Sequence, residues 1–347
     1  MKSNYFFLVI ILLIGNFSMA QQAPFMVCNA SGNTCSPYSD LTSAYNAASV
    51  GDYIYLPAGD FTLGATISKE IHFVGAGFDI NASITTGATR ISGDIVLDSN
   101  SNGSSFEGFY LTGNFKNYGT VDSITFSYIN FNKTMPFYEG YAWTWNNCFV
   151  KNSVVREYIY FGSSPSGFGE NNTISNSFIN SIHSMNHSVV KNCIISKYSA
   201  TNYCLYNIKN SVIKNNVIGG QGFSPDVSYI SENVLYLNNA TDALSGQLAN
   251  GKPFCTEFNN IFSIVIADTF VNSSIYTFDP TLDYHIKPTS AAHNAGDNGM
   301  DIGIYGGSTP WKEGAIPSNP HIFFKSIGST TDGSGNLPVQ IKVSAQN

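Results

Sequence analysis

A nine-residue pattern of apolar and polar positions recurs through the middle of the chain. Each copy reads Asn or His, any residue, an apolar residue or Thr, Val or Ile, Lys or Ser, Asn, any residue, an apolar residue, and Val or Ile. The clear copies span residues 147–155, 171–179, 187–195 and 210–218, and weaker copies that keep the apolar positions lie at 105–111, 123–129 and 229–235. The copies begin about 21 residues apart on average, which indicates stacked structural repeats.

Each copy consists of two short β-branched runs separated by one Asn, which predicts two strands with a bend between them. Asn tolerates the left-handed backbone conformation that a sharp bend requires. One turn of this length cannot bury its own apolar face, but stacked turns can. Equivalent residues of stacked turns lie about 4.8 Å apart, so Asn side chains can hydrogen-bond from turn to turn. We therefore predict an all-β fold, a parallel β-helix, with these residues at its bends: Asn152, Asn176, Asn192 and Asn215.

A leucine-rich repeat is the alternative, but it needs a regular Leu period that the chain lacks. Before the repeats, residues 40–48 predict a short helix with Asp40 as its N-cap. After them, we expect 308–347 to form a proline-containing connector and a small β-strand tail, with strands at 321–327 and 337–345. Alternation with polar residues predicts that one face of the second strand is buried through Val339, Ile341 and Val343.

Two flanking segments resemble a known superfamily. The motifs are G-D-x-I-x-L-P-x-G at 51–59, I-x-F-x-G-x-G at 71–77, and a closing stretch made of 290–296 and 301–307. Together they resemble the N-terminal cap, first turn and closing segment of secreted bacterial proteins of the pectin-lyase-like superfamily. The resemblance covers about residues 36–310 and implies a right-handed parallel β-helix.

The N-terminus predicts export. Lys2 precedes an apolar run over 6–14 and a small-x-small site at 18–20, which together predict a signal peptide over 1–20. No later apolar stretch is long enough to span a membrane. We expect a secreted or cell-surface monomer whose β-helix domain covers 21–307.

Six cysteines in an exported chain are compatible with disulfides. We expect a disulfide between Cys28 and Cys35, which are close in sequence and flank a Gly-Asn turn. The pairing of the others stays open. The remaining options are buried thiols in predicted strands, at Cys148 and Cys193, and a second bridge between Cys204 and Cys255.

The composition narrows the function. Charged residues make up 11% of the chain, with 16 Lys and Arg against 23 Asp and Glu, while Asn contributes 38 residues. Few charges and many aromatics argue against disorder and against a helical bundle. A net charge of −7 argues against a nucleic-acid partner.

Catalytic chemistry has weak candidates. The resemblance implies that an active member would carry Asp, Lys and Arg on one outer face, often with Ca²⁺. The polygalacturonase-like motifs N-T-D, G-H-G and R-I-K and the pectate-lyase-like R-x-P-x-x-R are absent. The best set is Arg156 and Glu157, with His183, His187 and Lys191 one or two turns further on. The alternative is that these are surface residues of unrelated loops.

Two features suit ligand binding. Aromatic residues gather in the longest insertions between copies, where flat rings could stack on sugars; the alternative is that they cover the core. The rings proposed for binding are Tyr138, Tyr141, Trp143, Trp145, Tyr158 and Tyr160. In addition, Lys151, Lys191 and Lys214 share one register with Ser175, and such a stripe could meet an acidic polysaccharide or merely keep the protein soluble.

A hard cation would be the one cofactor to consider. Near the closing stretch, four carboxylates could hold Ca²⁺ or simply cap turns: Asp279, Asp283, Asp297 and Asp301. The sequence as a whole favours a secreted, non-catalytic protein that binds carbohydrate or a surface partner. The alternative is a polysaccharide lyase or glycoside hydrolase that acts on an acidic polysaccharide.

Overall fold

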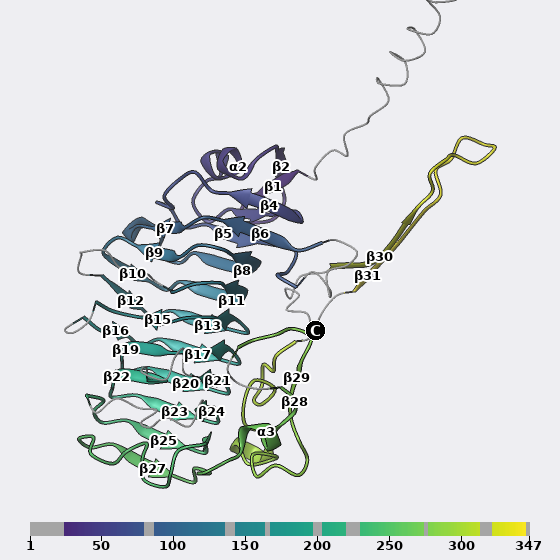
Figure 1. The fold of residues 1–347 in the computed structure, drawn as a ribbon. Helices are drawn as coiled ribbons and strands as arrows, with labels where there is room; N and C mark the ends of the chain where they lie inside the picture. Colours follow the sequence, from purple (N-terminus) through teal and green to yellow (C-terminus); the bar gives the residue numbers. More distant parts are fainter. Residues whose placement is uncertain are drawn as a thin grey trace, which may run out of the picture.

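The chain forms a right-handed parallel β-helix, in which short strands of successive turns stack in register (Figure 1). The computed structural model describes residues 24–79, 87–135, 143–163, 167–196, 203–219, 230–273, 277–312 and 321–344. The predicted signal peptide, 1–20, lies outside these residues. No helix in this described part is long and apolar enough to cross a bilayer.

A small cap covers the N-terminal end of the stack. Strands β1 (Phe25–Cys28) and β2 (Cys35–Tyr38) pair antiparallel, and a disulfide joins Cys28 to Cys35. The predicted helix is confirmed as α2 (Leu41–Ala47), where the Asp40 carboxylate accepts a hydrogen bond of 2.8 Å from the backbone N–H of Ser43. The inner face of α2 is buried over the first turns.

Three sides make up the stack; the first and second contribute one strand or strand half per turn, and the third contributes up to two short strands. The first side contains β3 (Tyr53–Tyr55), β5 (His72–Val74), β8 (Ser105–Leu111), β11 (Thr125–Phe131), β13 (Phe149–Lys151), β17 (Thr173–Ser175), β20 (Val189–Lys191), β23 (Val212–Lys214), β25 (Leu235–Leu237) and β27 (Thr256–Phe258). Past the bend, the second side contains the later halves of β8 and β11 with β4 (Gly59–Thr62), β6 (Thr89–Ser92), β14 (Val154–Val155), β18 (Phe178–Ile179), β21 (Ile194–Ser196), β24 (Val217–Gly219) and β26 (Ala240–Thr241). The third side contains β7 (Ile95–Leu97), β9 (Phe115–Asn117), β10 (Thr120–Asp122), β12 (Thr144–Asn146), β15 (Ile159–Tyr160), β16 (Gly169–Glu170), β19 (Ile182–Asn186) and β22 (Leu205–Lys209).

The four clear repeat copies are confirmed by the strand register. Val150 pairs with Ile174, Ile174 with Val190, and Val190 with Ile213. The weaker copy at 229–235 is wrong: Ile213 pairs with Tyr236, so this turn runs over 233–241. The reason is that Asn233 and Asn238 provide its left-handed bends.

The bends have the expected backbone conformation. Asn152, Asn176, Asn192 and Asn215 have φ angles of 49°, 48°, 53° and 56°. The first residue of each copy forms a second left-handed bend, which the sequence analysis did not assign. This second set contains Asn147, Asn171, His187 and Asn210.

The predicted turn-to-turn Asn hydrogen bonds occur one position after the predicted bends, and also at the second bend, where Nδ2 of Asn233 donates to Oδ1 of Asn210 at 2.8 Å. Nδ2 of Asn216 donates to Oδ1 of Asn239, and Nδ2 of Asn239 donates to Oδ1 of Asn260, both at 3.0 Å. The side chains of Asn152, Asn176 and Asn215 instead hydrogen-bond to a segment from much later in the chain. Residues 291–312, here called the closing segment, pack along the second side of the stack (Figure 1).

The closing segment is held by hydrogen bonds from the bends. Nδ2 of Asn176 donates to the carbonyls of Ile304 and Gly306, at 2.9 and 2.8 Å, and Nδ2 of Asn152 donates to that of Pro310. Apolar contacts add to these bonds, because a second buried cluster combines strand residues with closing-segment residues, among them Val154, Phe178, Ile194, Val217, Ile302, Ile304 and Trp311. Before it lie α3 (Ile266–Thr269), β28 (Phe270–Asn272) and β29 (Asp283–Ile286). Short 3-10 turns occur at Ser99–Ser101 in the stack and at Asp297–Gly299 within the closing segment.

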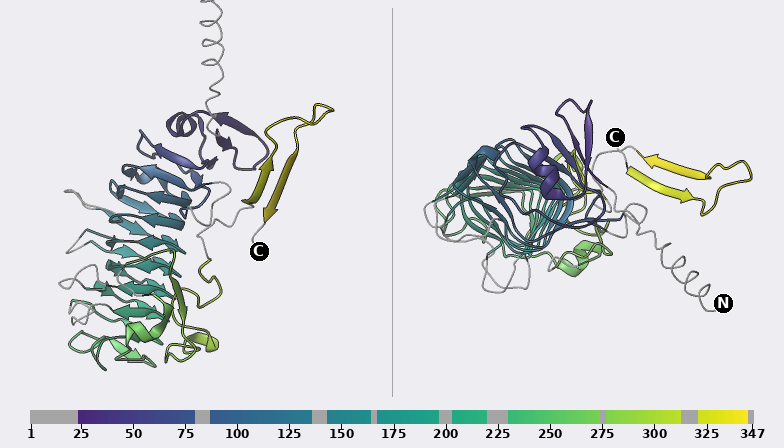
Figure 2. Two further views of the ribbon diagram at one scale, coloured as in Figure 1. Left: turned by 45° about the vertical axis from the view of Figure 1, so that its right-hand side comes forward. Right: turned by 90° about the horizontal axis from the view of Figure 1, so that it is seen from above.

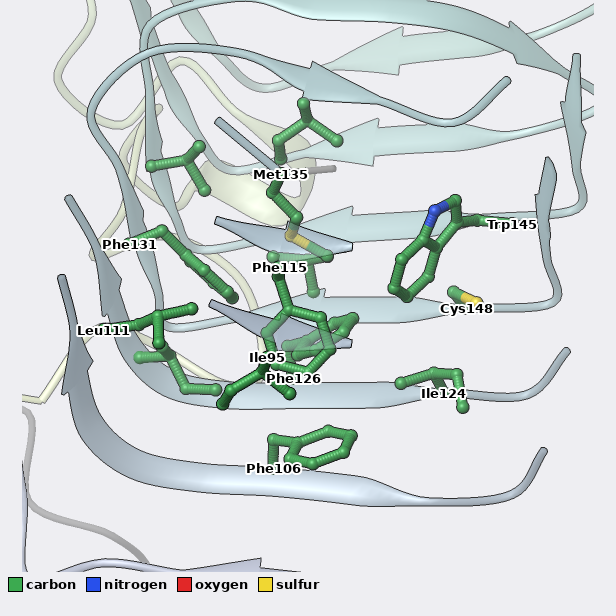
Figure 3. Close-up of a cluster of buried hydrophobic side chains, with 14 of the residues drawn as sticks. Ile95, Phe106, Leu111, Phe115, Ile124, Phe126, Phe131, Met135, Trp145 and Cys148 are labelled. Atoms are coloured by element: carbon green, nitrogen blue, oxygen red, sulfur yellow. The ribbon is translucent and has the colours of Figure 1, made fainter. Parts of the chain in front are cut away.

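The interior of the stack is filled with aromatic and branched side chains (Figure 3). Phe115 contacts Phe106 and Phe126 edge-on, with ring centroids 4.9 and 4.8 Å apart. Cys148 and Cys193 are buried thiols, and burial raises the pKa of each to about 12. No disulfide joins Cys204 to Cys255.

The C-terminal tail forms a separate hairpin that projects beside the stack (Figure 2). Strands β30 (His321–Ile327) and β31 (Val339–Ser344) pair antiparallel, as the sequence predicts. The predicted burial of one face is wrong. Val339, Ile341 and Val343 are 53%, 52% and 57% exposed, because each strand of this sheet pairs with the other alone in the described part of the chain.

Candidate functional site

A row of aromatic rings lies on the outer surface of the third side, formed by β15, β19 and β22. Tyr160 pairs with His183, and His183 pairs with Tyr206, so these three residues occupy one register on successive turns. Their predecessors Ile159, Ile182 and Leu205 point into the core, and alternation along each strand therefore directs the rings outward. We call this set the aromatic ladder; it consists of Tyr158, Tyr160, His183, Tyr203 and Tyr206.

The rings of the aromatic ladder contact one another and remain partly open. Ring centroids are 4.5 Å apart for Tyr160 and His183 and 5.1 Å apart for His183 and Tyr206. The ring planes are tilted by 52° and 32°, so neighbours do not cover each other completely. Tyr158 and Tyr203 flank the row, and all five side chains are half-buried.

His183 is a neutral ring with a defined tautomer. Nε2 of His183 lies 2.8 Å from Oγ of Ser181, and that hydroxyl donates its own hydrogen to the carbonyl of Tyr203. Nε2 must therefore carry the ring hydrogen, which leaves Nδ1 as an acceptor. Burial lowers the pKa of His183 to about 4, so the ring is uncharged at neutral pH.

A carboxylate, that of Glu157, directly precedes the first residue of the aromatic ladder in the sequence. Glu157 accepts a hydrogen bond of 2.8 Å from the hydroxyl of Thr134. Burial, followed by the charges of Tyr158, Tyr206 and Glu157, raises the pKa of Tyr160 to about 12. The hydroxyl of Tyr160 therefore stays protonated at the pH of ordinary buffers and can donate a hydrogen bond.

The burial of His183 predicts a pH dependence of stability. Because its pKa is lower in the folded than in the unfolded protein, the unfolded chain binds a proton first as pH falls from about 6.5. The free energy of unfolding should decrease between pH 6.5 and 4, by on the order of 3 kcal/mol from this group. Urea unfolding at several pH values will measure it. His183→Phe should flatten that part of the profile. If the variant and the unmodified protein had the same profile, His183 would have the same pKa in the folded and the unfolded protein.

The two tryptophans predicted to bind sugar do not lie at the surface. Trp145 is 0% exposed and Trp143 is 5% exposed. Nε1 of Trp145 donates to Oδ1 of Asn117 at 2.9 Å, and its ring packs against Phe115 and Phe126. Trp145 belongs to β12 and Trp143 directly precedes it, and both occupy inward positions in a stretch that the sequence analysis placed in an outer loop. Tyr138 and Tyr141 lie outside the described residues.

The lysine stripe has the predicted register. Lys151, Ser175, Lys191 and Lys214 pair in that order on β13, β17, β20 and β23. Nζ of Lys214 lies 2.7 Å from Oδ2 of Asp297 in the closing segment, and this bond helps to hold the pKa of Asp297 below its usual value. Lys191, Lys214 and Asp297 line a groove of about 230 Å³ between the stack and the closing segment.

The catalytic candidates have separate partners. Arg156 donates to Oδ1 of Asn130 and to the carbonyl of Phe278, which ties the stack to the residues that precede the closing segment. Glu157 is bound by Thr134, and Lys191 lines the groove on β20. The structure therefore gives Arg156 a structural contact and does not gather these three side chains around one reaction centre.

The four aspartates have separate partners too. Asp279 accepts from Thr281, Asp283 from His285, and Asp301 from the backbone N–H of Asn294. Asp297 is bound by Lys214 and Asn238. In the described ranges, no group of three or more His, Cys, Asp or Glu side chains is placed to hold a metal ion.

Sequence reasoning missed three members of the aromatic ladder: His183 as a ring, Tyr203 and Tyr206. A signal was present, because an apolar residue followed by a ring recurs every 23 residues, at Ile159-Tyr160, Ile182-His183 and Leu205-Tyr206. Outside the nine-residue pattern, this second period marks the third side of the stack.

The comparison with solved structures includes a match to a pectate lyase. The crystal structure of pectate lyase Pel9A matches with a TM-score of 0.35 and 16% sequence identity, over 83% of this chain and 94% of that chain. No family model and no curated protein matches the sequence. The class of the protein therefore rests on its strand register: it is a right-handed parallel β-helix that carries an outward aromatic ladder.

Proposed function

We propose that the protein is a secreted or cell-surface β-helix that binds carbohydrate through its aromatic ladder. The observation that carries the proposal is the row of half-buried rings at one register of β15, β19 and β22. Tilted, partly open aromatic faces beside tyrosine hydroxyls suit sugars, which have apolar C–H faces and hydroxyl rims. A signal peptide over 1–20 would deliver such a protein outside the cell.

Binding rather than catalysis fits the contacts of the charged side chains. Arg156 and Lys214 are engaged by the polypeptide itself, through Phe278 and Asp297. The lysine stripe is the feature that would favour an acidic polysaccharide. Lys191, which belongs to this stripe, could contact such a ligand, so acidic polysaccharides are included in the test. Ca²⁺ would be expected to bind only if an acidic ligand supplied further oxygen atoms.

The test is a substitution in the aromatic ladder. Purified protein will be titrated calorimetrically with a panel of neutral and acidic polysaccharides. Tyr160→Ala and Tyr206→Ala should each weaken binding by roughly fivefold to tenfold, because each removes one stacked ring. Tyr55→Ala is the matched control, since Tyr55 is 40% exposed on β3 near the N-terminal cap and should leave binding unchanged.

Two results would contradict the proposal. Equal affinity of the Tyr160, Tyr206 and Tyr55 variants would show that the ladder is not the binding surface. New unsaturated-uronate absorbance or new reducing ends, released from pectin or alginate with or without calcium, would show that the protein is a lyase or hydrolase.

A further inference from the structure

The aromatic ladder has a direction. Its central rings, Tyr160, His183 and Tyr206, belong to three successive turns and therefore lie in a line parallel to the axis of the stack. Their separations, 4.5 and 5.1 Å between ring centroids, follow the spacing of the strands. A pyranose unit in an extended 1,4-linked chain repeats at a similar interval.

The central ring offers a polar group at the middle of this line. Nε2 of His183 donates to Ser181, so Nδ1 retains a lone pair, and Nδ1 makes no hydrogen bond in the part of the chain that the structure describes. An acceptor between two tyrosine rings suits a ligand hydroxyl. A carboxylate cannot supply that hydrogen at neutral pH.

The charges at the ladder disfavour an anion. Glu157 lies close enough to Tyr160 to contribute to its raised pKa, and it would repel a uronate. Two lysines elsewhere on the third side are already paired: Lys116 lies 2.6 Å from Asp94, and Lys209 lies 3.3 Å from Glu232. The lysine stripe, which could attract an anion, lies on the first side of the stack.

Resting on the function proposed above, we propose that the ligand is an uncharged, extended polysaccharide that runs along the axis of the stack. One sugar unit lies on each turn, over Tyr160, His183 and Tyr206 in order, and the central unit donates a hydroxyl hydrogen to Nδ1 of His183. The affinity of the site should therefore depend on the length of the polysaccharide as well as on its chemistry.

A length series on the unmodified protein tests this inference directly. The probes are β-1,4-linked gluco-, xylo- and manno-oligosaccharides of one to six units, with oligogalacturonides of the same lengths as the acidic arm. Affinity for the neutral series that binds should rise roughly fivefold with each unit up to three, because each adds one stacked ring, and then level off. Oligogalacturonides should bind more weakly at every length.

A substitution tests the hydroxyl contact. His183→Phe keeps a ring but removes the acceptor, and it should weaken trisaccharide binding roughly tenfold while the dependence on length persists. Tyr55→Phe, on β3 outside the ladder, is the control and should leave trisaccharide binding unchanged. Circular dichroism and a melting curve will establish that both variants are folded.

The outcomes separate this inference from the broader function. If no glycan of any kind binds the unmodified protein, carbohydrate binding itself is wrong, and this inference with it. If a glycan binds but single sugars bind as tightly as hexamers, if the acidic series binds best, or if folded His183→Phe binds like the unmodified protein, this inference alone is overturned.

Discussion

Replacement of Asn176 by valine should lower the free energy of unfolding by about 3–4 kcal/mol, from left-handed backbone strain and lost hydrogen bonds. Asn176 has a φ of 48°, a conformation that a β-branched residue tolerates poorly. Its Nδ2 also satisfies two carbonyls, those of Ile304 and Gly306, which would be left buried without a donor. Urea unfolding followed by circular dichroism will measure the loss.

Two further variants divide this effect into its parts. Asn176→Gly accepts the left-handed backbone, so it should retain only the loss from the missing amide. Asn171→Gly is the matched control, because Asn171 has a φ of 58° but an exposed side chain. A valine variant as stable as the original would refute the role of the bend Asn residues in holding the closing segment.

Truncation of Trp145 to alanine should destabilise the protein by about 3–5 kcal/mol, the usual cost of removing a large buried ring. The ring is fully buried and lies against Phe115 and Phe126, and its Nε1 hydrogen bond to Asn117 disappears with it. Thermal melting will show the change. This variant is therefore unsuitable as a probe of ligand binding.

Trp145→Phe separates packing from the hydrogen bond. It keeps most of the ring and should cost about 1–2 kcal/mol, chiefly from the unpaired Oδ1 of Asn117. Its affinity for any glycan should match that of the unmodified protein. A melting temperature that is unaffected by Trp145→Ala would instead place this ring at the surface, as the sequence suggested.

The stacked strands could be predicted because their requirements are local. A left-handed bend favours Asn, and short β-branched runs on either side fill the core, so the copies at 147–155 and 187–195 carry both signals in one stretch. The copy near 233 was misplaced because apolar residues at 230 and 235 mimic the pattern, whereas the bends at Asn233 and Asn238 decide the register.

The candidate site was harder to predict because it depends on which way a ring points. Trp145 and Tyr160 both sit in aromatic stretches between copies, yet one occupies an inward and the other an outward position. The partners of the bend Asn side chains were equally hidden, since Asn176 and Ile304 are 128 residues apart. Sequence periodicity reports neighbours in the stack and carries no information on a segment that returns from so far along the chain.

The closing segment should change how the molecule unfolds. A stack of repeats in which each turn contacts only its neighbours can fray from its ends. Here one segment is fastened to several turns, through Asn152, Asn176, Asn215 and Asn238. The fastened turns are thereby linked into one cooperative unit. Since the closing segment follows all of the stacked turns in the sequence, that unit is complete only after every turn that it fastens has been made.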